Sequence, residues 1–258
     1  MYLYASTSIR NSEVGSMYYR DLFIGHKIFW KISRKANYYG IYMRELKNWE
    51  KWPDSVSIEE IEKLLQFLPK WNGHFRCKNS TRFAQIFKQI HPTINELKDA
   101  RLESSKFNSE FLQKIKTIFD KVAKCQGQYQ STSSSKILHT ILPHLIVTWD
   151  GKIRQGILGN ENKKKGSMYA LDFLPKMQNE LFEAIASCMA EKKLNQEETI
   201  RYIRQECGNE TLPKLIDEHN YVIYSKTLEF KYYLDKNKEN GEISANEYKR
   251  FVQKFPSP

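Results

Sequence analysis

The stretch STSSSKILHTILPHLIVTWDGKIR, residues 131–154, decides how the rest of the chain is interpreted. Apolar residues recur at helical spacing in its first half, so a helix with one buried face is predicted there. These residues are Ile137, Leu138, Ile141, Leu142 and Leu145. Pro143 disfavours helical geometry at the residue before it, so we expect this helix to end at Leu142. Residues 145–149 are too apolar for a surface loop. They should cross the interior and deliver Asp150 to a defined position.

Asp150 opens a second predicted helix. Ile153, Ile157 and Leu158 share one face of that helix, so Asp150 stands at its N-cap. The simplest interpretation is a structural cap, with an Asp150–Arg154 pair on the side of the helix.

A second interpretation uses the hydroxyls at the start of the stretch. Ser133, Ser134 and Ser135 cluster at a helix start, where free backbone N–H groups and the helix dipole favour phosphate. Lys136 follows them directly, and the Asp150 carboxylate arrives fourteen residues later. This interpretation predicts a phosphate-binding site near a carboxylate.

The same residues resemble the core of the helix-hairpin-helix DNA glycosylases, the endonuclease III-like superfamily. Residues 149–154, WDGKIR, are similar to the family's catalytic aspartate followed by basic residues. Lys136 falls where bifunctional members keep their nucleophile, although the intervening helix is about one turn shorter here. The family's L-P-G-x-G hairpin is absent, and residues 126–130 read QGQYQ instead. The resemblance covers roughly thirty residues and is architectural elsewhere.

The resemblance implies a glycosylase that releases a damaged or modified base by hydrolysing its N-glycosidic bond. Asp150 would stabilise the oxocarbenium-like sugar. Lys136 would be either an amine nucleophile or a phosphate contact, and we favour the second, which makes the enzyme monofunctional. The base must leave the duplex, so a wedge residue is needed, with Gln126, Gln128 and Tyr129 as candidates by proximity alone.

Double-stranded DNA with an extruded base is therefore the expected partner. The expected DNA contacts are Ser133, Ser134, Ser135, Lys152, Arg154 and Gln128. The formal net charge is +11, with 29 Lys and Arg against 16 Asp and Glu in residues 1–176 and 12 against 14 in the remainder. This asymmetry suits a nucleic-acid face, although general solubility of a lysine-rich chain explains it equally well.

Composition predicts a mostly α fold, because the chain has only 11 Gly and 8 Pro in 258 residues and many amphipathic helical patterns. We expect one two-lobed domain and a monomer. Residues 57–158 would form the central lobe, residues 1–56 with 159–258 the second, and Asp150 would lie in the cleft between them. The aromatic-rich segment 1–56 should pack in the core or at the lobe interface.

Several helix boundaries follow from caps. Ser57, Asn108, Asn195 and Ser244 are predicted N-caps. A helix over 81–91 is expected to stop before Pro92, which would open another. Residues 170–192 should form one long helix.

Neither a metal nor a cofactor is expected. The four cysteines contain no C-x-x-C pair, and their spacings fit neither zinc nor iron–sulfur patterns, so they are interpreted as buried free thiols. Residues 235–247 approach an EF-hand loop but miss its register by one residue. An apolar run long enough to span a bilayer is lacking, and so is a signal peptide, which predicts a cytoplasmic protein.

Two other classes compete with the enzyme. One is a non-catalytic DNA-binding module on the same scaffold, with Asp150 purely a cap. The other is a helical interaction protein, which leaves the joint arrangement of serines, Lys136 and Asp150 unexplained. The residues do not select a base. Alkylated or oxidised purines would imply base-excision repair, and a modified phage base would imply antiviral defence.

Overall fold

The computed structural model describes residues 17–32, 58–71, 75, 80–125 and 127–255. All regular structure in these residues is helical, which confirms the mostly α prediction. The helices are α1 (Tyr19–Ile32), α3 (Ile58–Trp71), α4 (Ser80–Leu97), α5 (Ser109–Ala123), α6 (Ser131–Ile141), α7 (Gly151–Leu158), α8 (Gly166–Met168), α9 (Leu174–Lys192), α10 (Gln196–Glu206), α11 (Leu212–Asn220), α12 (Thr227–Glu239) and α13 (Ala245–Lys254). Two π-helical turns, η1 (Tyr169–Phe173) and η2 (Tyr221–Ser225), precede α9 and α12.

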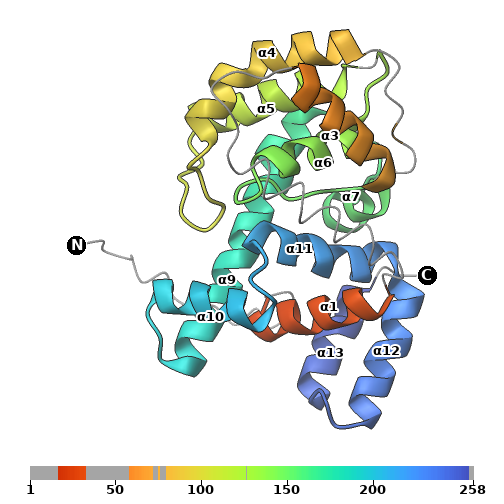
Figure 1. Ribbon diagram of the computed structural model, residues 1–258. Coiled ribbons are helices and arrows are strands. Elements are labelled where there is room, and N and C mark those ends of the chain that lie inside the picture. The colour runs from red at the N-terminus through yellow and green to blue at the C-terminus, as the bar shows by residue number, and fades with distance from the viewer. Residues whose placement is uncertain (1–16, 33–57, 72–74, 76–79, 126, 256–258) are drawn as a thin grey trace.

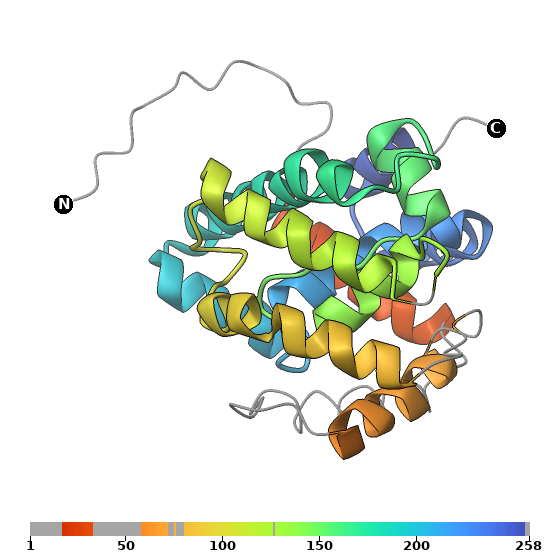
Figure 2. The same cartoon turned by 90° about the horizontal axis from the view of Figure 1, so that it is seen from above.

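Helices α3 to α7 gather at one end of the molecule (Figure 1). Seen from above, α4 and α5 lie side by side, with α3 next to α4 (Figure 2). The predicted break before Pro92 is wrong, because α4 continues through the proline to Leu97. Buried residues continue along one face on both sides of it, from Phe87 to Ile94. This packing stabilises the helix at Pro92, which has no backbone N–H to donate to the preceding turn.

The predicted central stretch is confirmed in its main features. Helix α6 ends at Ile141 with Leu142 as its C-cap, immediately before Pro143. Helix α7 begins after Asp150, whose side chain accepts a hydrogen bond from the backbone N–H of Ile153.

Capping predictions also agree with the structure wherever it describes them. Asn108 caps α5, and complete capping boxes start α10 at Asn195 and α13 at Ser244. Ser57 lies outside the described residues. The predicted helix over 170–192 starts instead at Leu174, because the chain first makes the π-helical turn η1.

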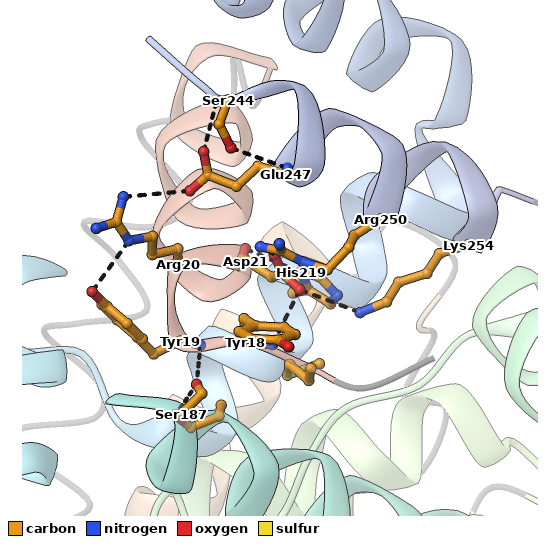
Figure 3. A network of polar contacts seen from close by, with 12 residues as sticks. Tyr18, Tyr19, Arg20, Asp21, Ser187, His219, Ser244, Glu247, Arg250 and Lys254 are labelled. Carbon is orange, nitrogen blue, oxygen red and sulfur yellow. Dashed lines mark hydrogen bonds and ion pairs between the residues drawn. The ribbon is translucent and has the colours of Figure 1, made fainter. Parts of the chain in front are cut away.

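Helix α1 packs among helices from the other end of the sequence, beside α9, α11 and α12. A buried ion network ties it to α13 (Figure 3). Asp21, only 1% exposed, accepts a hydrogen bond from Arg250 at 2.9 Å, and Lys254 lies 3.6 Å away. Tyr19 donates its backbone N–H to Ser187 of α9 at 3.1 Å.

Two hydrophobic clusters fill the interior. The larger joins α3 to α9 with parts of α1, α10 and α11, so its members come from both sides of the lobe boundary expected at Leu158. The smaller joins α1, η2, α12 and α13. None of the helices in the described ranges is both long and apolar enough to span a membrane.

Candidate functional site

The serines at the start of α6 face the interior. Ser134 and Ser135 are fully buried, and the Ser134 hydroxyl donates to the carbonyl of Phe119 at 2.9 Å. Ser135 Oγ accepts the backbone N–H of Trp149 at 3.2 Å. The expected phosphate contacts from these two hydroxyls do not fit this arrangement, because both join α6 to its neighbours. Ser133 is 7% exposed, and its hydroxyl donates to Gln130 at 3.2 Å.

The connector between α6 and α7 crosses the interior as predicted, since residues 145–149 are all buried. Tyr169 donates its hydroxyl to the carbonyl of Val147 at 2.7 Å, and the Thr148 hydroxyl donates to Asp217. The indole N–H of Trp149 donates to Ser131 at 3.3 Å, while its ring packs among aromatic residues of α5 and η1. These contacts fix the backbone immediately before Asp150.

Asp150 is half-buried, and both of its carboxylate oxygens accept hydrogen bonds. Oδ1 accepts the N–H of Ile153 at 2.8 Å, and Oδ2 accepts the hydroxyl of Ser225 at 2.7 Å. The carboxylate therefore joins the start of α7 to the end of η2. Burial raises the pKa of the Tyr221 hydroxyl most, Lys226 lowers it, and the charge of Asp150 raises it further.

Arg154 lies inward, contrary to the expectation of a DNA contact. Only 7% of it is exposed, and its guanidinium lies 5.1 Å from the centre of the Trp149 ring. Its Nε donates to the carbonyl of Glu161 at 2.9 Å, and Nη1 lies 3.5 Å from the hydroxyl of Thr132. Burial lowers its pKa, although Asp150 and Glu161 oppose that change. Arg154 thus stabilises the loop after α7 and makes no direct pair with Asp150.

The remaining predicted residues differ in exposure. Lys152, in the first turn of α7, is exposed, and Gln128 is exposed in the turn before α6. Lys136 is half-buried on α6, directly after the serine that binds the connector. Tyr129 is half-buried and donates its hydroxyl to Asp120 at 2.5 Å. Gln126 lies outside the described residues.

Helix α11 carries a buried polar network that was not among the residues predicted from the sequence. Lys214 lies 2.8 Å from Asp217, the carboxylate that accepts the hydroxyl of Thr148. Glu218, on the same helix, lies 2.7 Å from His26 of α1. Burial opposes the charge on Lys214, but Asp217 and Glu218 outweigh it and raise its pKa. The network connects the segment that carries Asp150 with α11 and α1. An apolar spacing pattern gives no signal for it.

A shallow pocket of about 260 Å³ on α10 is separate from these residues and is lined by Glu197, Ile200, Arg201, Arg204, Gln205 and Asn209. In the part of the chain that the structure describes, His, Cys, Asp and Glu side chains do not gather in a group that could hold a metal ion. Comparison of the chain with protein-family models, with curated proteins and with solved structures finds no match.

Proposed function

We propose that this protein is a monofunctional DNA glycosylase in which Asp150 is the catalytic carboxylate. One observation carries the proposal: a buried connector holds this carboxylate half-buried between the start of α7 and Ser225 of η2. A fixed negative charge can stabilise the positive sugar that forms as an N-glycosidic bond breaks. In the same step, water would add to C1′ and give a proton to the Asp150 carboxylate, while the base leaves with the electron pair of the broken N-glycosidic bond and, where it leaves as an anion, takes up a proton from solvent.

The surroundings of Asp150 supply two further parts of the proposal. Tyr221 is a half-buried aromatic residue of η2, the turn that also carries Ser225, and an extruded base could be held against such a ring. Lys152 is exposed in the first turn of α7 and would contact phosphate. Residues 57–158 would form one lobe, residues 1–56 with 159–258 the other, and Asp150 would lie at the cleft between them. Lys136 would contact phosphate or orient the DNA.

A non-catalytic DNA-binding module is the second candidate. One observation favours it: both oxygens of Asp150 are already used by internal donors, as expected for a structural cap. The two candidates predict the same salt dependence of DNA affinity. Reversing the charge of Lys152 should lower the slope of log K against log salt by about one for the lost phosphate contact.

Base release separates the two candidates. Duplexes carrying alkylated, oxidised or phage-type modified bases are incubated with the protein, and alkali reveals abasic sites. Asp150→Asn should keep both hydrogen bonds, because the amide can accept from Ile153 and donate to the oxygen of Ser225. We expect a stability loss of at most about 1 kcal/mol, retained DNA affinity, and base release reduced by at least about a hundredfold.

The result that would overturn the catalytic assignment is unchanged base release by folded Asp150→Asn. Lys136→Gln then determines the subclass. Loss of both base release and a borohydride-trapped protein–DNA adduct would make Lys136 the nucleophile. Weaker binding with retained release would make it a phosphate contact.

A further inference from the structure

Leu228 is the most exposed of the large hydrophobic residues in the described ranges, at 83%. It is the second residue of α12. Tyr232, one turn later, is 53% exposed and shares the same face of the helix. Single exposed apolar side chains are common on protein surfaces. Leu228 differs from such side chains in two ways: it follows closely after the residue that binds Asp150, and lysines flank it on the chain.

Leu228 follows closely after the residue that holds the candidate catalytic carboxylate. Ser225 donates to Asp150 at 2.7 Å, and Leu228 stands three residues further along the chain. Three residues span at most about 11 Å, and neighbouring bases of a duplex strand are about 3.4 Å apart. A nucleotide with its sugar at Asp150 would therefore bring the adjoining base steps within range of Leu228.

The charge around Leu228 favours a polyanionic partner. Lys226 and Lys231 flank it on the chain, and Lys231 is exposed. Glu229 is the acidic residue of this turn, and its carboxylate lies 2.9 Å from Lys226. The hydrogen bond from Lys226 lowers the pKa of Glu229 most, and the charge of Lys152 on α7 contributes further. Leu228 thus lies on the chain between Lys226 and Lys231, beside a Glu229 that Lys226 pairs with and that Lys152 influences, and an exposed apolar side chain among positive charges is the pattern of a wedge in a DNA-binding surface.

We propose that Leu228 enters the base stack and fills the space left by the extruded base. This inference rests on the proposed glycosylase function and deepens it. Insertion takes the apolar side chain out of water and offsets part of the cost of unstacking. It assigns the wedge to α12 in place of the turn before α6, where the Tyr129 hydroxyl is already bound to Asp120.

The test uses the full chain and a duplex with a central abasic-site analogue flanked by 2-aminopurine, whose fluorescence rises when it is unstacked. Wild type should bind and raise the fluorescence. Leu228→Ala should abolish most of the rise and weaken binding about tenfold, with unchanged thermal stability because the side chain is exposed. Leu228→Phe should retain the rise. Leu171→Ala is the matched control, since Leu171 is also exposed, at 54%, but belongs to η1.

The outcomes distinguish the wedge from the enzyme. An equal fluorescence rise with Leu228→Ala, while wild type releases bases from the panel above, refutes the wedge and leaves the glycosylase standing. A change of oligomeric state in Leu228→Ala, without an effect on DNA, would make this surface a protein contact and also refute the wedge. If wild type neither binds the duplex nor releases a base, the proposed function fails and the wedge with it.

Discussion

Gly156 provides a direct test of how α7 meets η2. This glycine lies in the middle of α7, and a Cβ added to it would stand 2.1, 2.3 and 2.7 Å from Cδ1, Cε1 and Cγ of Tyr224. Carbon atoms in favourable contact are about 3.5–4.0 Å apart. Gly156→Ala therefore requires the Tyr224 ring, or the whole of η2, to move by roughly 1 Å or more.

Two opposing contributions determine how much Gly156→Ala changes the free energy of unfolding. Overpacking of this kind costs about 1–3 kcal/mol, whereas alanine in place of glycine inside a helix stabilises by about 1 kcal/mol. The free energy of unfolding should fall by about 1 kcal/mol. In a Tyr224→Ala background the clash is absent and only the helix contribution remains, so the same substitution should stabilise. Its effect thus changes sign, with a coupling energy of about 1–3 kcal/mol.

Urea unfolding of wild type, both single variants and the double variant measures this cycle. Equal slopes against urea would keep the four free energies comparable. Gly156→Ala should also lower base release in the proposed assay, because Ser225, the partner of Asp150, directly follows Tyr224. If Gly156→Ala stabilises the wild-type protein, the contact between α7 and Tyr224 is not as described.

Two further predictions concern buried charge. Burial raises the pKa of Glu210 from 4.5 to about 8, and the charge of Glu218 adds to this effect. Between these two pH values the folded state keeps a proton on Glu210 that the unfolded state has lost. The contribution of Glu210 to the free energy of unfolding therefore falls as the pH rises from about 4.5 to about 8. Glu210→Gln should remove this decrease, which is at most about 1.4 kcal/mol of unfolding free energy per pH unit. Unfolding curves at several pH values that show the same decrease in the variant would contradict the prediction. Arg250→Met leaves the buried carboxylate of Asp21 with the backbone N–H of Tyr18 at 3.1 Å and with Lys254 at 3.6 Å, and should lower the free energy of unfolding by about 2–4 kcal/mol. If calorimetry shows that the free energy of unfolding falls by less than about 0.5 kcal/mol, as is typical of an exposed pair, the network of Figure 3 does not hold α13 on α1.

Local chemistry made much of the central stretch predictable. The break at Pro143, the buried connector and the cap at Asp150 each follow from residues within one helical turn of the feature, and all three agree with the structure. The proline within α4 was predicted wrongly because tertiary packing outweighed the local penalty of Pro92.

The environment of each candidate site residue could not be predicted in the same way. Ser225 reaches Asp150 across 75 residues of sequence, and no local pattern encodes that contact. Serines inside a helix can return their hydrogen bonds to nearby carbonyls, as Ser135 does to Thr132 at 3.0 Å, so a serine-rich helix start does not by itself indicate an open phosphate site. Arg154 was interpreted as a surface cation because its position over Trp149 depends on the tertiary fold.

The placement of α1 has a consequence for folding during synthesis. Its hydrogen-bonding partners on other helices of the described chain lie 168 to 229 residues later in the sequence. At about 5–20 residues per second, the ribosome needs roughly 10–40 s to produce them. Among the described residues, the helices in most contact with α1, whose apolar face includes Leu22 and Ile28, are α9, α11 and α12, whereas α4, α5 and α6 find their neighbours soon after they emerge. Docking of α1 on α9, α11 and α12 is therefore a late step of synthesis.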